Sequence, residues 1–174
     1  IGVQTCALPI FQLNMAAMTL ETILKDYTDY NLWANRLIVE WLKNKPSDLW
    51  TAEVPSSLPS LHKTLLHIWG AEEVWIERLE ERAPGPFLTS YFEGTTEEVF
   101  DRLLKCSEQF RDLAAGQPAD YFSGTSTYVH INGREYTQNR AKMILHCMQH
   151  STYHRGQIVT IARNLGLSDP PQTD

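Results

Sequence analysis

Apolar residues recur along residues 19–44 at the three- and four-residue steps that separate neighbours on one face of a helix. A helix with this repeat buries one face and leaves the other in water. We therefore predict a long amphipathic helix here, with an apolar face formed by Leu20, Ile23, Leu24, Tyr27, Tyr30, Leu37, Ile38 and Trp41. Pro46, Pro55 and Pro59 then indicate a connecting segment.

Residues that cap helix ends mark two further helices. Ser60 precedes a helical stretch over residues 61–82, where its side chain can accept from a free backbone N–H of the first turn. Thr95 or Thr96, followed by Glu98, has the form of a capping box at the start of a third helix. We expect this third helix to reach about residue 113.

Residues 126–138 show a different pattern, in which apolar and polar positions alternate as in a β-strand. Asn132-Gly133 is a favoured pair for a two-residue hairpin turn, so we expect a short hairpin or an extended loop. A last helix is predicted over about 138–165, with Gly166 as its C-terminal cap. Four long helices with a long third connection predict an all-α, up-and-down-type four-helix bundle whose third connection carries the hairpin or loop.

The composition fits one ordinary globular core and argues against several classes of protein. The chain has 174 residues, of which 43% are hydrophobic, and a formal net charge of −6. That charge, without any run of Lys or Arg, argues against nucleic-acid binding. No segment approaches the ~20 apolar residues of a membrane helix. Three cysteines suggest no disulfide framework, so we expect a cytoplasmic protein.

Both ends of the chain are predicted to lie outside the fold. Residues 1–14 resemble a translated sequencing adaptor, which predicts a non-native extension before a natural start at Met15 or Met18. The helical domain is expected over residues 15–168. A flexible tail is expected over residues 169–174.

Three histidines, His146, His150 and His154, follow one another at four-residue intervals in the last predicted helix. A helix turns about 100° per residue, so side chains four residues apart form a stripe along one face. Buried imidazoles need partners for their ring nitrogens, and one divalent metal can satisfy several of them together. The alternative is that one or more of these histidines faces solvent or pairs with a nearby carbonyl.

A metal site would need a further ligand from a second helix, and His67 is the natural candidate. Ala71, Val74 and Trp75 share its face of the second predicted helix, which places His67 on the core side. A lone buried histidine is otherwise structural, so its meaning depends on the histidines of the last helix. His62 lies about 140° away around the helix and is expected at the flank or in solvent.

Other chemical sites fit the sequence less well. There is no H-E-x-x-H motif, and no glutamate stands three residues before a histidine as in di-iron bundles. Cys147 has no C-x-x-C partner and is predicted to be a small core residue. Ser151 follows His150, but no G-x-S-x-G motif supports a hydrolase of the serine type.

Three segments of the chain together resemble the DinB/YfiT-like superfamily. They are YNLWAN in the first helix, TLLHIWGAEEVWIERL in the second and HCMQHSTYHRGQI in the last. The similarity runs in order from about Leu20 to Leu165. Its most specific element is H-x-x-x-H-R-G-Q, and the next is His67 within L-x-H-I-x-x-A-E-x-x-W.

The resemblance implies a four-helix bundle that holds a metal through three histidines and often forms homodimers. It assigns the ligands to His67, His150 and His154. His146 is then a neighbour that supports a ligand or lines the pocket, although a shift of register would exchange it with a ligand. Members with known activity transfer a low-molecular-weight thiol to an electrophile or isomerise maleylpyruvate with the help of a thiol.

The expected function is therefore thiol transfer to, or thiol-assisted isomerisation of, a small electrophile, with one divalent ion (Zn, Ni, Mn or Fe) activating the thiol or a water molecule. Gln157 is predicted to orient a ligand, and Arg155 to form an ion pair or to meet an anionic substrate group. Tyr30, Trp33 and Trp75 are candidates for the pocket wall. The alternatives are a hydrolase that uses a metal-bound hydroxide and a noncatalytic metal-binding stress-response dimer.

Overall fold

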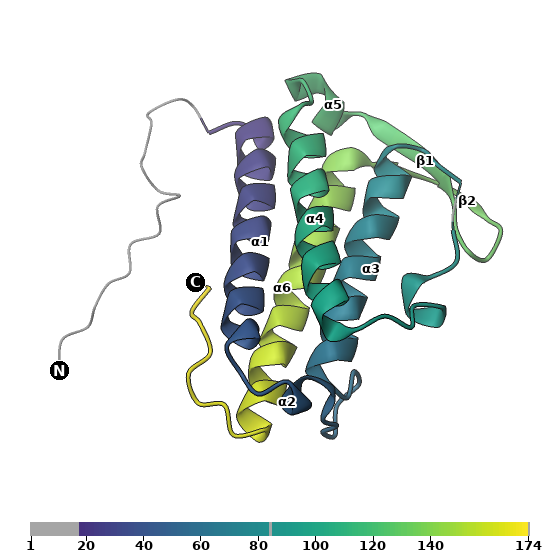
Figure 1. The fold of residues 1–174 in the computed structure, drawn as a ribbon. Helices are drawn as coiled ribbons and strands as arrows, with labels where there is room; N and C mark the ends of the chain where they lie inside the picture. The colour runs from purple at the N-terminus through teal and green to yellow at the C-terminus, as the bar shows by residue number, and fades with distance from the viewer. Residues whose placement is uncertain (1–17, 84, 174) are drawn as a thin grey trace.

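The computed structural model describes residues 18–83 and 85–173, and its body is a bundle of four long helices (Figure 1). The four helices are α1 (Leu20–Lys43), α3 (Leu61–Leu79), α4 (Thr96–Ala115) and α6 (Arg140–Asn164). α1 and α3 each pack against both α4 and α6. The predicted all-α four-helix bundle with a long third connection is confirmed.

The helices do not simply alternate in direction, so the up-and-down detail of the prediction is wrong. His62 contacts Thr96 at the start of both α3 and α4, and Glu72 contacts Ser107 near the middle of both. These two contacts show that α3 and α4 run parallel. The physical reason is the second connection, residues 80–95, which is long enough to return to the other end of the bundle (Figure 1).

Helix ends follow the capping residues closely. Ser60 accepts from the backbone of Lys63 at the start of α3, and Thr95 forms a capping box with Glu98 at the start of α4. α3 ends at Leu79, three residues earlier than predicted, because the chain turns through a positive φ of 55° at residue 81.

α6 begins later than predicted, because the residues before it form a strand. β1 (Thr125–Val129) and β2 (Glu135–Asn139) make the expected antiparallel hairpin. The predicted two-residue turn at Asn132-Gly133 is wrong: Val129 pairs with Glu135, so five residues, 130–134, form the loop. Gly133 still takes the left-handed conformation, with φ 78°.

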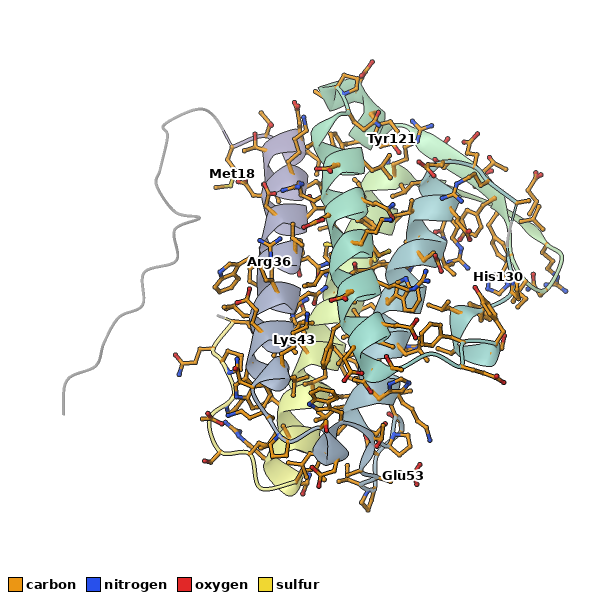
Figure 2. All side chains as sticks on the ribbon, viewed as in Figure 1. Met18, Arg36, Lys43, Glu53, Tyr121 and His130 are labelled. Carbon is orange, nitrogen blue, oxygen red and sulfur yellow. The ribbon has the colours of Figure 1, made fainter. Side chains whose placement is uncertain are left out.

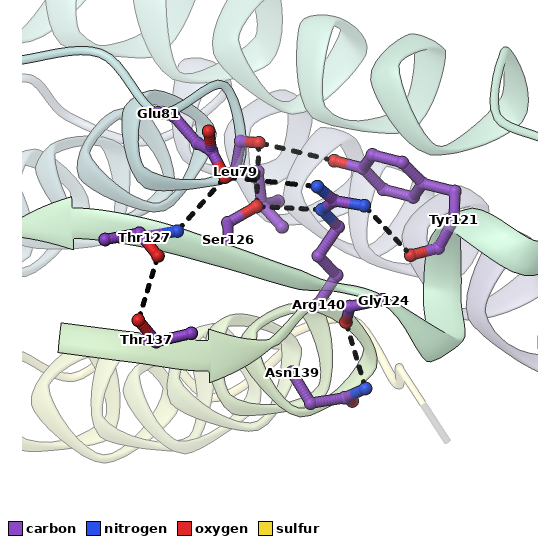
Figure 3. A network of polar contacts seen from close by, with 9 residues as sticks. All are labelled: Leu79, Glu81, Tyr121, Gly124, Ser126, Thr127, Thr137, Asn139 and Arg140. Atoms are coloured by element: carbon purple, nitrogen blue, oxygen red, sulfur yellow. Dashed lines mark hydrogen bonds and ion pairs between the residues drawn. The ribbon is translucent and has the colours of Figure 1, made fainter.

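A polar network fastens the hairpin to the end of the bundle (Figure 3). Arg140 at the start of α6 donates from Nε to the Ser126 hydroxyl, which donates to the carbonyl of Leu79 at the end of α3. Glu81 accepts from the backbone N–H of Thr127 in β1. The hairpin is therefore held by the two helices that carry the histidines.

The core fills the space between the four helices, and Figure 2 shows its side chains. Each helix contributes fully buried apolar residues, among them Leu24, Ile38, Leu65, Ile68, Phe100, Phe110, Met143 and Ile158. Trp50, from the short helix α2 (Asp48–Thr51), closes one end and donates its indole N–H to the carbonyl of Leu42. Two further short helices, η2 (Leu88–Ser90) and α5 (Ala119–Ser123), lie in the later connections. None of the described helices is long and apolar enough to cross a membrane.

The C-terminal segment, for which a flexible tail is predicted over residues 169–174, lies along α1 as far as residue 173 (Figure 1). Lys45 donates to both carboxylate oxygens of Asp169, and the Tyr30 hydroxyl donates to the carbonyl of Thr173 at 2.6 Å. These contacts place the segment over the outer side of α1, and its flexibility stays a prediction. The predicted extension, residues 1–14, and the candidate start at Met15 lie outside the described residues.

Candidate metal centre

Three of the predicted site residues meet where α3 and α6 pack side by side. His67 Nε2 lies 3.0 Å from His150 Nε2, and His154 Nε2 lies 3.1 Å from the same atom. His150 and His154 are one turn apart on α6, and α3 runs antiparallel to α6 beside them. Within the described part of the chain, these residues form the single group of three or more potential ligands whose donor atoms converge.

The arrangement of the three imidazoles fits a divalent ion. A tetrahedral zinc ion about 2.0–2.1 Å from each imidazole nitrogen would set those nitrogens about 3.3 Å apart. The observed separations of 3.0 and 3.1 Å are close to that value. Without an ion, the Nε2 atom of His150 faces the Nε2 atoms of His67 and His154. A neutral imidazole carries a single N–H, so hydrogen bonds among the three rings cannot satisfy all three Nε2 atoms. The three-histidine group can therefore hold a metal, and imidazole ligands suit Zn, Ni or Fe.

Gln157 orients one of these rings. Its Oε1 accepts a hydrogen bond from His154 Nδ1 at 2.6 Å, while its Nε2 donates to the hydroxyls of Ser57 and Tyr153. Since Nδ1 carries the proton, the lone pair of His154 Nε2 points at the other histidines. Gln157 is thus placed to orient a ligand.

Burial keeps the three imidazoles neutral. It lowers the pKa of His150 to about 4, with a further contribution from the neighbouring imidazoles. It also lowers the pKa of His67 and His154, and the hydrogen bond to Gln157 partly offsets the effect at His154. Neutral imidazole is the form that binds metal, so no proton has to be displaced from these rings at neutral pH.

The metal-free protein should lose stability as the pH falls from 6.5 towards 4, the ordinary and folded pKa values of His150. In this window unfolded His150 binds a proton that the folded state excludes, so acid favours unfolding. Below about 4 the folded state also takes up the proton and this contribution levels off. Urea unfolding of the protein in the presence of a chelator, repeated at several pH values, would measure this loss of stability. The matched control is His150→Gln, whose stability should fall less over the same window; parallel curves would contradict the expectation.

His146 stands apart from this group, although it lies one turn earlier on α6. Its side chain is exposed, and its ring packs on Trp75 at 4.9 Å and stacks over His150 at 6.5 Å between centroids. Trp75 is buried and also contacts Tyr128 of the hairpin. His146 and Trp75 therefore form one wall beside the cluster.

The other histidines do not approach the cluster. His62 is half-buried and shares a hydrogen bond of 2.9 Å with Thr96 Oγ1. His130 lies in the hairpin loop, where it contacts Tyr136 (Figure 2). The half-buried position of His62 agrees with its expected place at the flank of the helix.

Tyr30 and Trp33, the predicted pocket aromatics of α1, lie against a different part of the molecule. The ring of Tyr30 lies under the Arg155 guanidinium at 5.4 Å, and Trp33 packs on Tyr30 at 5.8 Å. Among the described residues, no hydrogen bond or ring contact joins either aromatic to the three histidines. These contacts give them a packing role.

Arg155, predicted to form an ion pair or to meet an anionic substrate group, lies inside the bundle near the carboxyl group of Glu72. Its side chain is only 2% exposed. Nη1 donates to Oδ1 of Asn31 at 2.7 Å and of Asn35 at 2.9 Å, and Nη2 donates to Thr152 Oγ1. The buried guanidinium is therefore engaged inside the bundle. The helical position about 100° from the histidine stripe points Arg155 into the core, not into the pocket.

A buried carboxylate missed in the sequence completes this network. Glu72 of α3 is fully buried and accepts from four side chains that come from the other three long helices: Asn31, Asn35, Ser107 and Ser151. Burial raises the pKa of Glu72, while these hydrogen bonds and the charge of Arg155 act in the opposite direction. One polar cluster thus joins all four helices directly behind the histidines.

The sequence carried a signal for this cluster. Asn31 and Asn35 stand four residues apart in YNLWAN, so they share a helix face. Glu72 and Glu73 stand together in an otherwise apolar stretch, and one of them must turn inward with its neighbours. Two amides and an acid on facing helices are a pattern typical of a satisfied buried network.

Comparisons with known proteins agree with the fold. The model of the DinB family matches residues 15–174. The chain is 25% identical over 150 residues to Protein DinB of Bacillus subtilis, covering 82% of this chain and 86% of that protein. A solved member of the family from Exiguobacterium sibiricum superposes with a TM-score of 0.68 at 14% identity, covering 91% of this chain and all of the other. A DinB-like protein from Bacillus cereus gives 0.65 at 16% identity, covering 84% and 95%.

Proposed function

This chain belongs to the DinB family, and from that membership and its histidine cluster we propose that it is a divalent-metal-dependent enzyme of thiol chemistry. It would transfer a low-molecular-weight thiol to a small electrophile or use the thiol to assist an isomerisation. The observation that carries the proposal is the convergence of three neutral imidazoles, those of His67, His150 and His154, without a carboxylate among them.

The chain's part in this chemistry is to hold three uncharged donors at one point. A divalent ion bound there keeps its positive charge and open coordination positions, so it lowers the pKa of a bound thiol or water. Burial keeps His67 and His150 unprotonated, and Gln157 fixes the tautomer of His154. His146 and Trp75 pack on each other beside the cluster and offer an aromatic surface to a small electrophile.

A small-molecule thiol is needed because the described cysteines are unsuitable as nucleophiles. Cys106 and Cys147 are both buried, and burial raises the pKa of each thiol. The thiolate is the reactive form, and neither side chain reaches it near neutral pH. The described part of the chain therefore offers no reactive thiol, which supports one supplied from solution.

Hydrolysis, the first alternative, has less support. Water attack usually relies on a general base near the metal, as the glutamate of H-E-x-x-H provides. The converging group in the described residues contains histidines alone, and the nearby Glu72 is occupied by four hydrogen bonds. A noncatalytic metal-binding homodimer is the second alternative. It predicts the same bound metal and no turnover.

The proposed transfer can be tested with 1-chloro-2,4-dinitrobenzene as the electrophile. The thiol sulfur forms a C–S bond, chloride leaves with the bonding pair, and the thiol proton passes to solvent. Protein made without a histidine tag is first assayed for bound metal by elemental analysis, and then for turnover with glutathione, cysteine and 2-mercaptoethanol.

We expect bound metal and turnover that depends on both metal and thiol. Metal without turnover of any thiol would favour the noncatalytic dimer, and sedimentation would then report its oligomeric state. Metal-dependent hydrolysis of ester substrates in the absence of thiol would favour the hydrolase.

A further inference from the structure

A shallow groove lies beside α3, between that helix and two later segments, the connection that follows it and the loop of the hairpin (Figure 1). It encloses about 20 Å³, so a ligand would lie along it and not be enclosed. We propose, on the basis of the function proposed above, that this groove binds the electrophile. The electrophile is then an elongated apolar molecule, and Arg78 holds a carboxylate at the end far from the metal.

The groove continues the face of α3 that carries His67. Ala71, Val74 and Arg78 follow His67 at steps of four, three and four residues, which keeps them on one side of the helix. All four side chains are half-buried, so the core does not close this face. A molecule whose reacting end lies at the histidine cluster can therefore extend along α3 to Arg78.

Arg78 is the residue that selects the ligand. Its guanidinium carbon lies 4.6 Å from the centre of the Trp75 ring and 4.7 Å from that of Tyr128. Among the described residues, no hydrogen bond or ion pair engages the Arg78 side chain. Burial lowers the pKa of Arg78, although Tyr128 and Glu77 act in the opposite direction. The guanidinium has thus lost water without gaining a hydrogen-bonded partner, and a carboxylate can provide one.

The other charged residues of the groove leave Arg78 available. Arg82 also lines the groove, but its side chain pairs with Glu80 at 2.7 Å and with Glu77 at 3.5 Å. The lining contains two arginines and one glutamate, and that glutamate is the partner of Arg82. The positive charge that remains is that of Arg78, so the groove favours an anion.

The rest of the wall suits an apolar body. Exposed apolar side chains that gather in one place, beside charged residues, are typical of a binding surface. Three such side chains line this groove, with exposed fractions of 42%, 41% and 57%: Phe87, Val129 and Ile131. A ligand that covers them removes apolar surface from water, which stabilises the complex.

The distance along α3 sets the length of the ligand. Arg78 stacks on Trp75, eight residues from His67, and a helix rises about 1.5 Å per residue. The guanidinium is therefore about 12 Å along the helix axis from His67. Aromatic rings line this distance, because Trp75 packs on His146 and His146 stacks over His150. A molecule with two rings fits this span, whereas a short dicarboxylate cannot reach both ends.

The test compares an acid with its own methyl ester, which has nearly the same shape. The chalcone with a carboxylate in the para position of its benzoyl ring is a suitable electrophile. A thiol adds to the β-carbon by a new C–S bond, the alkene pair passes to the α-carbon, which takes a proton from solvent, and the thiol proton is released. The saturated analogue cannot react and reports binding alone. In calorimetry, the wild-type protein should bind the saturated acid at least about tenfold more tightly than its methyl ester.

Arg78→Met keeps an apolar side chain over the two rings without the charge, so it should remove the preference for the acid. Arg78→Lys should retain part of it. Ile131→Glu adds a negative charge at an exposed position of the groove and should also lower the preference, which keeps the test decisive if Arg78→Met does not fold. The matched control is Arg102→Met. Arg102 stacks on Trp69 at 5.8 Å, outside the groove, and its loss should leave the preference intact.

The preference should be the same in chelator-treated protein. A preference that requires bound zinc would show that the carboxylate binds the ion, and it would overturn the proposal. Equal affinities of acid and ester in the wild type, or a preference that survives Arg78→Met, would do the same. Thiol addition at equal rates to the unsaturated acid and ester would overturn the groove and leave the thiol function standing. A preference that depends on Arg78, in a protein that adds no thiol, would keep the anion site and overturn the thiol function.

Discussion

Replacing His150 with alanine is expected to weaken metal binding more than any substitution outside the group of His67, His150 and His154. His150 is the central residue of the cluster, with its Nε2 at 3.0 Å from His67 and 3.1 Å from His154. Losing a residue that merely supports a ligand typically costs 10–100-fold in metal affinity. Losing a ligand itself should exceed that, so we expect a fall of more than about 100-fold.

The affinity can be measured by competition with a chromogenic chelator on metal-free protein reloaded with zinc. His67→Ala should act like His150→Ala, although the two residues lie 83 positions apart in the sequence. The matched control is His146→Ala, which removes an exposed histidine one turn away on the same helix and should change the affinity by less than about tenfold. A larger loss from His146→Ala than from His150→Ala would reassign the ligand set.

The parts of this structure that could be predicted from the sequence are those set by local physics. Helix ends followed their caps, because a Ser60 or Thr95 hydroxyl satisfies backbone N–H groups within its own turn. The stripe of histidines on α6 followed from helical spacing alone. The meeting of His150 and His154 with His67 was implied by the family resemblance, and the structure brings these three side chains together.

The remaining features depend on how distant elements pack, and local patterns do not record this. Periodicity predicts that α3 and α4 are helices but is the same for a parallel and an antiparallel pair. Arg155 was assigned from its charge to a substrate or an ion pair, because its amide partners lie on α1, more than a hundred residues away. Charged residues are rarely buried without partners. The burial of Arg155 could therefore be predicted only together with the positions of Glu72, Asn31 and Asn35.

Replacing Glu72 with alanine should have the largest effect on stability, lowering the free energy of unfolding by about 3–5 kcal/mol. The substitution leaves Arg155 buried without its counter-charge, and it removes the acceptor for four buried side chains. Each donor left without a partner costs about 1–3 kcal/mol, although the costs are not additive. Since a domain of this kind is stable by only about 5–15 kcal/mol, the loss would be a large fraction of the total.

Urea unfolding of chelator-treated protein at pH 7 would measure this loss without any contribution from metal. The adjacent residue provides the matched control, because Glu73 is only half-buried and no hydrogen bond or ion pair of its side chain is found among the described residues. Glu73→Ala should change stability by less than about 1 kcal/mol. Equal effects of the two substitutions would show that the cluster contributes no more than an ordinary helix position. If Glu72→Ala destabilises as expected yet leaves metal affinity in the refolded protein unchanged, the four-helix network supports the bundle and not the orientation of the histidines.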